Sequence, residues 1–323
     1  MENFKNRLDL TDFSAKVDSL KSKIASIVVG QEHAVDLILT ALLADGHVLI
    51  EGVPGVAKTL LAKLTAKLID ANYSRIQFTP DLMPSDVLGT SVFNVKTTEF
   101  VFHQGPIFAE LILIDEINRA PAKTQAALFE VMEERQITVE GFTRKMNEVC
   151  IIIATQNPIE QEGTYRLPEA QLDRFLMKIN MDYPHPEEEI TILKRHHENK
   201  SLANLKDIPP MIAKEEILSF RNLVSEVYVE ECLLHYISEI IIATRKSSAI
   251  YLGASPRASV ALLNTAKAFA LLQGRDFVTP DDIKYIAVPV LHHRVILSPE
   301  TEMEGLSATA VCKRMIDKIE VPK

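Results

Sequence analysis

The stretch HVLIEGVPGVAKTLL, His47–Leu61, decides the fold of this chain. Its first five residues are predicted to form a short apolar strand. A helix is expected over Thr59–Ile69, because Leu61, Leu64 and Leu68 then fall on one face. The glycine-containing turn between strand and helix points several backbone N–H groups and the helix N-terminus into one small space. The stretch therefore predicts an anion site where a strand meets a helix.

The turn follows the phosphate-loop pattern GxxxxGK[ST], known as Walker A. Lys58 adds a positive charge, and Thr59 adds a hydroxyl that can bind Mg²⁺. Ala57 stands where the second glycine of the pattern belongs, a departure of one methyl group. An ordinary strand–turn–helix corner is the alternative interpretation. The residues expected to bind the nucleotide here are Gly52, Val53, Pro54, Gly55, Val56, Ala57, Lys58, Thr59 and Leu60.

A second apolar strand, Leu111–Asp115 within the string LILIDE, ends in two carboxylates. Asp115 is expected to hold Mg²⁺ through water, opposite the hydroxyl of Thr59. Glu116 is expected to polarise the water that attacks the γ-phosphate. The alternative is a buried strand that ends in a solvated turn. The distance of this pair downstream of a phosphate loop favours the catalytic interpretation.

Composition narrows the class of protein. The chain has 323 residues, which allows two domains, and its net charge of −9 disfavours broad binding to nucleic acid. No apolar run reaches membrane-spanning length and the N-terminus lacks a signal peptide, so a cytoplasmic protein without membrane insertion is expected. The three cysteines are too far apart for a disulfide framework or zinc site.

The adjacent pairs His196–His197 and His292–His293 lack metal-ligand spacing and are predicted to be solvated.

The rest of the sequence alternates apolar strands with helical patterns. Helices are expected from a cap at Ser14 and around Ala34–Leu43. Further strands are predicted at Ser74–Thr79, Val149–Thr155 and Phe175–Asn180, and hairpins at Thr90–Phe102 and Gln136–Glu148. Buried strands alternating with helices are typical of a parallel sheet covered on both faces. We therefore predict an α/β P-loop NTPase core with a five-stranded parallel sheet.

The segment Tyr183–Pro186, reading YPHP, is the best candidate linker in the chain. From Glu187 onward only helical periods are found. The predicted domains are therefore 1–183, the α/β core with N-terminal helices and two hairpins, and 184–323, an all-helical lid.

Several motifs in sequence order carry a resemblance to a known family. The phosphate loop, the LILIDE strand and a later strand ending in Ala154–Asn157 together resemble the AAA+ ATPases. The hairpins look like those of the helix-2-insert branch, which holds the MoxR proteins, magnesium chelatase subunits and MCM helicases. The strings that look most like MoxR are GVPGVAKT, DEINRAPAKTQAALFEVMEERQ, TQNPIEQEGTYRLPEAQLDRF and GASPRAS. The resemblance extends from about Val28 to Leu297.

The resemblance implies roles for residues outside the phosphate loop. Asn157 matches sensor 1, which positions the attacking water. Arg174 matches the arginine finger, which points toward the nucleotide of the next subunit. Arg257 matches sensor 2, which reaches the nucleotide from the lid. Val28, Val29 and Gly30 would flank adenine by the family's pattern, and an interdomain turn is the alternative interpretation of these three residues.

Other interpretations stay open for the arginines. Arg174 could be a surface arginine paired with Asp173, and Arg257 a solvated residue at a helix N-terminus. Arg119 and Arg166 could contact nucleotide, a neighbouring subunit or nearby acids.

The resemblance implies a MoxR-type ATPase that hydrolyses ATP with Mg²⁺ to drive chaperone-like remodelling or activation of partner proteins. It also implies a homo-oligomer, a hexameric ring, and partners or clients with von Willebrand factor A domains. Three alternatives remain: an MCM-like nucleic-acid motor, a chelatase-type motor subunit, and a nucleotide-gated binding module with little turnover. The acidic composition makes a nucleic-acid partner the least favoured of these.

Overall fold

A parallel β-sheet forms the centre of the molecule. The computed structural model describes residues 8–139, 141–157, 165, 167–197 and 208–322. The five strands, in spatial order, are β2 (Tyr73–Gln77), β5 (Leu111–Asp115), β8 (Ile151–Gln156), β1 (Val48–Gly52) and β9 (Met177–Met181). All neighbouring strands are parallel, which confirms the predicted five-stranded sheet. Because all strands run the same way, their carboxyl ends meet at one edge of the sheet and their amino ends at the other.

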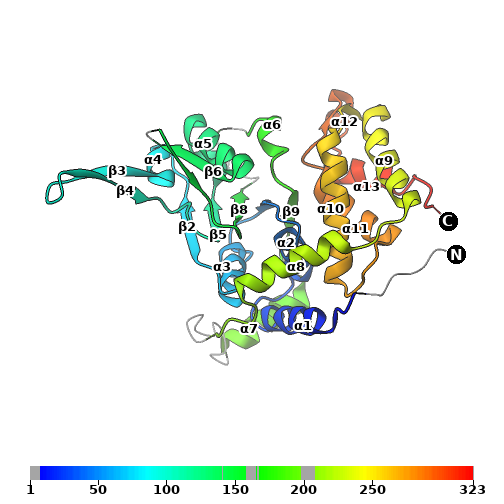
Figure 1. Ribbon diagram of the computed structural model, residues 1–323. Helices are drawn as coiled ribbons and strands as arrows, with labels where there is room; N and C mark the ends of the chain where they lie inside the picture. The colour runs from blue at the N-terminus through cyan, green and yellow to red at the C-terminus, as the bar shows by residue number, and fades with distance from the viewer. Residues whose placement is uncertain (1–7, 140, 158–164, 166, 198–207, 323) are drawn as a thin grey trace.

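Each strand contributes alternate side chains to two separate hydrophobic cores. Leu111 and Leu113 of β5 point into one core, whereas Ile112 and Ile114 point into the other. The first core is covered by α1 (Thr11–Ala25), α2 (Glu32–Leu43) and α3 (Lys58–Leu68), and the second by α4 (Pro84–Leu88) and α5 (Ala122–Glu134). Figure 1 shows these helices on opposite sides of the sheet. The buried apolar strands therefore reflect a sheet with no solvent-facing side.

The C-terminal helices are α7 (Pro186–His197), α8 (Lys214–Glu226), α9 (Glu231–Lys246), α10 (Pro256–Leu272), α11 (Pro280–Leu291), α12 (Pro299–Met303) and α13 (Ala308–Ile316). They join the core through α8 and α10, which contact α2, and through α11, which contacts β9. Phe220 of α8 meets Phe13 of α1 edge to face at 4.8 Å between ring centroids. Both parts of the chain therefore share one apolar core.

This region is helical as predicted, but it also holds a small β-ribbon that the sequence analysis missed. Strand β10 (Ile250–Leu252) pairs antiparallel with β11 (Ile296–Leu297). Each strand is too short to show an alternating pattern that could be separated from a helix or loop.

Two antiparallel hairpins extend from the core, both confirmed as predicted. The first is β3 (Gly89–Asn94) with β4 (Glu99–Gln104), and the second is β6 (Gln136–Val139) with β7 (Phe142–Lys145). The guanidinium of Arg144 lies over the ring of Phe102, 3.9 Å from its centroid, so the second hairpin contacts the first. The β3–β4 hairpin projects well beyond the sheet (Figure 1).

Two predictions of local structure were wrong. The first helix begins at Thr11, so Ser14 lies inside it instead of capping it, and the Ser14 N–H donates to the Leu10 carbonyl. His292 and His293 are buried and not solvated. They follow the end of α11 where it meets the start of β9, and His293 Nε2 lies 3.2 Å from the Phe175 carbonyl oxygen. The exposed pair His196–His197 agrees with its prediction.

In the described part of the chain, no helix has both the length and the apolar character needed to cross a membrane.

Candidate functional site

The phosphate loop joins β1 to α3 at the carboxyl edge of the sheet. Gly52 ends the strand, and a Cβ there would lie 2.6 Å from the Met181 carbonyl oxygen, so no larger residue fits. Gly55 has a φ of +90° and no atom within 4 Å of its Cβ position. The loop therefore passes close to β9 at its start and opens at its tip, where an anion can approach the backbone.

Ala57 and Lys58 lie at the start of α3. Ala57 has a φ of +64°, in the left-handed region that glycine adopts most easily. The left-handed turn therefore persists without the second glycine, at a cost of about 1–2 kcal/mol in backbone strain. The Lys58 ammonium donates to the Gly52 carbonyl at 2.7 Å, so its charge lies folded over the loop.

Asp115 ends β5 next to the strand that carries Thr155. Its carboxylate is buried, accepts from the Thr155 hydroxyl at 3.2 Å and pairs with Arg75 Nε at 2.6 Å. The hydrogen bond to this carboxylate raises the pKa of Arg75. Asp115 is therefore held at the carboxyl edge by the Thr155 hydroxyl and the Arg75 guanidinium.

Glu116 is the residue after the strand, and its backbone is strained. Its φ of +58° is rare for a residue with a side chain, and its N–H donates to the Thr155 hydroxyl at 3.1 Å. One carboxylate oxygen accepts from Gln77 Nε2 at 2.7 Å and lies 3.2 Å from Arg119 Nε. Backbone strain of this kind is often found at functional sites, where the surrounding structure holds the residue in one direction.

Asn157 follows β8 and is almost fully buried, with 9% of its surface exposed. The register pairs Glu51 of β1 with Gln156 of β8, so Asn157 lies level with the start of the phosphate loop. The carboxyl edge therefore brings together Lys58, Asp115, Glu116 and Asn157, because Asp115 ends β5, Glu116 and Asn157 follow β5 and β8, and Lys58 begins α3.

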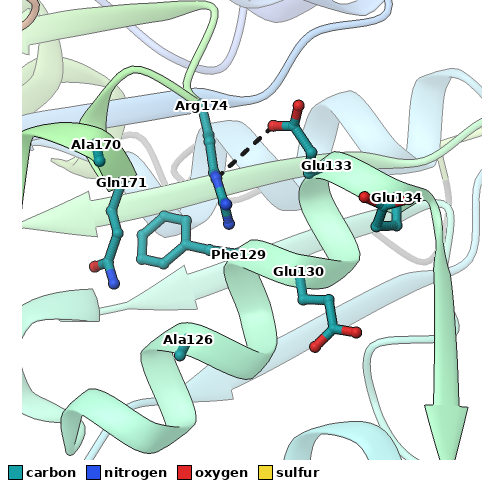
Figure 2. A pocket seen from close by; sticks show the side chains of 8 residues that line it. All are labelled: Ala126, Phe129, Glu130, Glu133, Glu134, Ala170, Gln171 and Arg174. Atoms are coloured by element: carbon teal, nitrogen blue, oxygen red, sulfur yellow. Dashed lines mark ion pairs between the residues drawn. The ribbon is translucent and has the colours of Figure 1, made fainter.

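Arg174 lies at the opposite edge of the sheet. It precedes β9, whereas the phosphate loop follows β1, so the length of a five-residue strand, roughly 15 Å, separates the two edges. Its Nε lies 3.7 Å from Glu133 on α5, and its guanidinium lies 5.9 Å from the Phe129 ring centroid. Figure 2 shows Arg174 directed along α5 toward Glu133, at the rim of an open surface pocket.

Arg257, at the N-terminus of α10, meets the same carboxylate. Its Nη2 lies 2.8 Å from Glu133, so Glu133 pairs with both Arg174 and Arg257. Arg257 thus lies away from the phosphate loop of its own chain in this structure, and its contact with a nucleotide stays a prediction. The physical reason is that α10 packs beside α2 and brings its N-terminus to the amino edge of the sheet. Asp173, the predicted alternative partner of Arg174, pairs instead with Arg294 at 2.7 Å.

Comparison with known proteins agrees with this geometry. Residues 47–177 match the model of the ATPase family associated with various cellular activities (AAA), and residues 242–314 match an AAA lid domain. The chaperone MoxR1 of Mycobacterium tuberculosis is 41% identical, over 93% of this chain and 81% of that protein. The chain belongs to the MoxR family of AAA+ ATPases.

Two further relatives agree with this assignment. The uncharacterized protein YeaC of Bacillus subtilis is 47% identical, over 93% of this chain and 92% of that protein. A crystal structure from Cytophaga hutchinsonii, of a protein assigned as an ATPase, is 40% identical with a TM-score of 0.87, and covers 97% of this chain and 96% of that one. Membership of the AAA family implies that this MoxR-family ATPase binds a nucleotide.

The oxygen atoms at the carboxyl edge fit a nucleotide with a divalent cation. Thr59 offers a hydroxyl on the first turn of α3, and Asp115 offers a buried carboxylate on the next strand but one. Mg²⁺ prefers oxygen ligands and is commonly held by one or two protein side chains together with phosphates and water. The open loop tip and the Lys58 ammonium match the charge of those phosphates.

The residues predicted to flank adenine lie farther along the same edge. Gln31 donates to the Asp182 carbonyl at 3.2 Å, which brings Val29 and Gly30 to the end of β9. Gly30 has a φ of +73°, and a Cβ there would lie 2.4 Å from a carboxylate oxygen of Glu188 on α7. The positive φ therefore favours glycine at this turn, whereas the Glu188 carboxylate, at the end of a flexible side chain, could move aside.

Sequence reasoning missed several residues of the MoxR-family site. Gln77 and Arg75 on β2 hold the two acidic side chains, and Glu133 on α5 pairs with the two arginines. Arg75 and Gln77 lie at alternate positions of β2 and so point to the same face of the sheet. This spacing was the available sequence signal that both could contact the neighbouring acids. Arg119 contacts Glu116, which agrees with its interpretation as a partner of nearby acids, whereas Arg166 lies outside the described residues.

Proposed function

We propose that this MoxR-family ATPase hydrolyses ATP with Mg²⁺ at the carboxyl edge of its sheet. Lys58 and the loop residues Gly52–Leu60 bind the phosphates, and Thr59 and Asp115 hold the metal. The metal, when bound, neutralises charge on the β- and γ-phosphates. Support comes from the convergence of these side chains at one edge of a parallel sheet.

Glu116 orients and polarises the attacking water, and Asn157 fixes the position of that water. One carboxylate oxygen of Glu116 is bound by Gln77 and Arg119. These two contacts fix the direction of the side chain at the carboxyl edge.

Arg174 and Arg257 serve the nucleotide of a neighbouring copy. The observation that carries this proposal is their shared position at Glu133, a strand length from the Lys58 of their own chain. A site at one edge and its arginines at the other require head-to-tail contact, which closes into a ring when the rotation permits. A hexameric ring is the expected closed form.

The output of hydrolysis is a chaperone-like movement that remodels or activates partner proteins. MoxR1, a relative along 93% of this chain, is named a chaperone. Partners with von Willebrand factor A domains are part of the same proposal. The division into a core, 1–183, and a lid, 184–323, also remains a proposal.

The deciding experiment mixes two inactive variants, Arg174→Ala and Glu116→Gln. A mixed interface joins the intact finger of a Glu116→Gln subunit to the intact base of an Arg174→Ala subunit, so phosphate release should return in part. Each variant alone, at the same total concentration, is the control. If phosphate release does not recover in well-mixed oligomers, Arg174 is not the arginine finger.

A nucleic-acid motor and a binding module without turnover remain the rivals. DNA and RNA should not stimulate phosphate release, because the net charge is −9. Stimulation by either would favour the motor, and no phosphate release at high protein concentration would favour the binding module.

A further inference from the structure

Arg294 is a buried arginine of the lid that has all its donors paired. It follows α11, and only 3% of its side chain is exposed. Nε donates to Asp173 Oδ1 at 2.7 Å, Nη1 to the carbonyls of Leu176 at 2.9 Å and Val290, and Nη2 to the carbonyls of Phe175 at 2.6 Å and Asp173 at 3.3 Å. A guanidinium has five N–H donors, so each donor has an acceptor.

Four of these five acceptors belong to the short segment Asp173–Leu176. This segment contains Arg174, the arginine proposed to act on a neighbouring nucleotide. Val290, the fifth acceptor, lies on α11 itself. The lid therefore binds the backbone on both sides of Arg174 through one side chain.

The core fixes the same segment from the other side. Phe175 is fully buried and packs edge to face on Phe129 of α5, 5.9 Å between centroids. The Leu176 N–H donates to the His47 carbonyl at 2.8 Å, where β9 begins beside β1. The Cα of Arg174 is thus held between a core anchor and a lid anchor, while its side chain runs over the surface of α5.

A second lid contact ends on the same carboxylate. Ser255, the residue before α10, donates to Asp173 Oδ2 at 3.4 Å, so Asp173 binds the lid through both oxygens. Ser255 lies two residues before Arg257. Asp173 therefore links the core segment that carries Arg174 to the lid segment that carries Arg257.

We infer that Arg294 is the positioning residue of the arginine finger. It holds Asp173–Leu176 so that Arg174 points out of its own subunit at a fixed angle. This inference rests on the proposed function, because it assigns to Arg294 an effect on the neighbour's nucleotide. Arg294 does not touch that nucleotide; its effect passes through the backbone of Arg174. Movement of the lid in one subunit then changes the hydrolysis rate in the next.

The test variant is Arg294→Lys, which keeps the charge but has three donors in a tetrahedral arrangement. A lysine cannot reach both the Asp173 carboxylate and the carbonyls on two sides. We expect turnover of the oligomer to fall roughly 10²-fold, because a displacement of about 1 Å at a positioned group costs that much. The affinity of Lys58 and its loop for ATP should stay within about twofold, since the carboxyl edge is untouched.

The matched control is Arg275→Lys. Arg275 also pairs with a carboxylate through its two terminal nitrogens, but its partner is Asp282 within the lid. This control should leave turnover within about twofold of the parent. Light scattering at the assay concentration should give the same oligomer size for both variants.

The decisive readout is complementation in mixed oligomers. Arg294→Lys subunits have an intact base, and Glu116→Gln subunits have an intact finger and an intact Arg294. Mixing them should restore phosphate release in part, as the mixture of Arg174→Ala with Glu116→Gln should. A general folding defect would not be complemented, because the misfolded subunit could not supply its own base.

Each outcome decides between the two levels of the proposal. Recovery in both mixtures supports the positioning role. Recovery with Arg174→Ala but not with Arg294→Lys overturns the role of Arg294 and leaves the proposed function intact. No recovery in either mixture overturns both. Should Arg294→Lys fail to fold, Asp173→Asn replaces it: the amide keeps an acceptor but loses the charge, and a smaller, still complementable fall is expected.

Discussion

The two edges of the central sheet differ in how their functional side chains are held. At the carboxyl edge, Lys58 begins α3 and Glu116 directly follows β5, so both come from the core. At the amino edge, Arg174 and Arg257 come from the core and the lid and meet only at Glu133. The first edge is built entirely from elements and side-chain contacts of the core. The second depends on how the lid packs, so it can respond to lid movement while the first stays fixed.

The largest effect is expected at the carboxyl edge, from Glu116→Gln. The amide keeps the shape but cannot polarise water, so turnover should fall about 10²–10⁴-fold. The affinity for ATP should change little, because Asp115 and Lys58 remain. Phosphate release and calorimetric titration check the two halves of this prediction. Turnover at the parent rate would assign the role of base to another residue.

The motifs predicted the carboxyl edge well because its residues are neighbours in sequence or follow buried strands. Asp115 and Glu116 end the string LILIDE, and the register then fixes where they lie. The partners of these residues were not predictable in the same way. Gln77 and Glu116 are 39 positions apart, and their contact depends on β2 lying next to β5, an order that no local pattern contains.

The amino edge was predicted less well, because its contacts depend on tertiary packing. The family resemblance indicated Arg174 and Arg257 as residues but not their shared partner Glu133. His292 and His293 were read as solvated, since adjacent residues on a helix face different directions. In the structure they follow the end of α11, where a helical pattern no longer applies.

The amino edge should be the acid-sensitive one. Burial lowers the pKa of His47 to about 3 and that of His292 to about 4, and it lowers the pKa of His293 well below 6.5. The unfolded chain therefore binds more protons than the folded one below pH 6.5, so stability is complete above this pH and falls as the pH drops toward 4. At pH 5 the loss should be about 2 kcal/mol for each of His47 and His292.

Urea unfolding at pH 7.5 and pH 5 measures this loss. His292→Gln should reduce the difference between the two curves, and the exposed His197→Gln should leave it unchanged. If the parent and His292→Gln lose the same free energy of unfolding between pH 7.5 and pH 5, the acid sensitivity comes from other residues.

A smaller effect is expected from Lys58→Ala, which tests whether the carboxyl edge binds nucleotide by itself. Loss of a charged hydrogen bond to phosphate costs about 1.5–3 kcal/mol, so ATP affinity should fall roughly 10–150-fold. Calorimetric titration of a dilute, unassembled sample measures the ATP affinity of a single subunit. Arg174→Ala is the matched control there, since its own loop is intact and its affinity should not change.

The smallest effect is expected from Ala57→Gly, which supplies the second glycine of the loop pattern. Because Ala57 has a φ of +64°, glycine should relieve strain and stabilise the chain by about 1 kcal/mol. Ala62→Gly, inside α3, should instead destabilise it by about 0.5–1 kcal/mol. Chemical denaturation measures both, and equal signs for the two variants would contradict the role of the left-handed turn.

The separation of the two edges also has a consequence for stoichiometry. In the proposed head-to-tail assembly, an open row of subunits leaves one phosphate loop without arginines at one end and one set of arginines without a phosphate loop at the other. A pair of copies thus completes only one of its two composite sites. A longer open row also leaves one composite site incomplete. Only closure makes the number of complete sites equal the number of subunits. The rate per subunit should therefore climb with each added copy and reach its plateau when the ring closes.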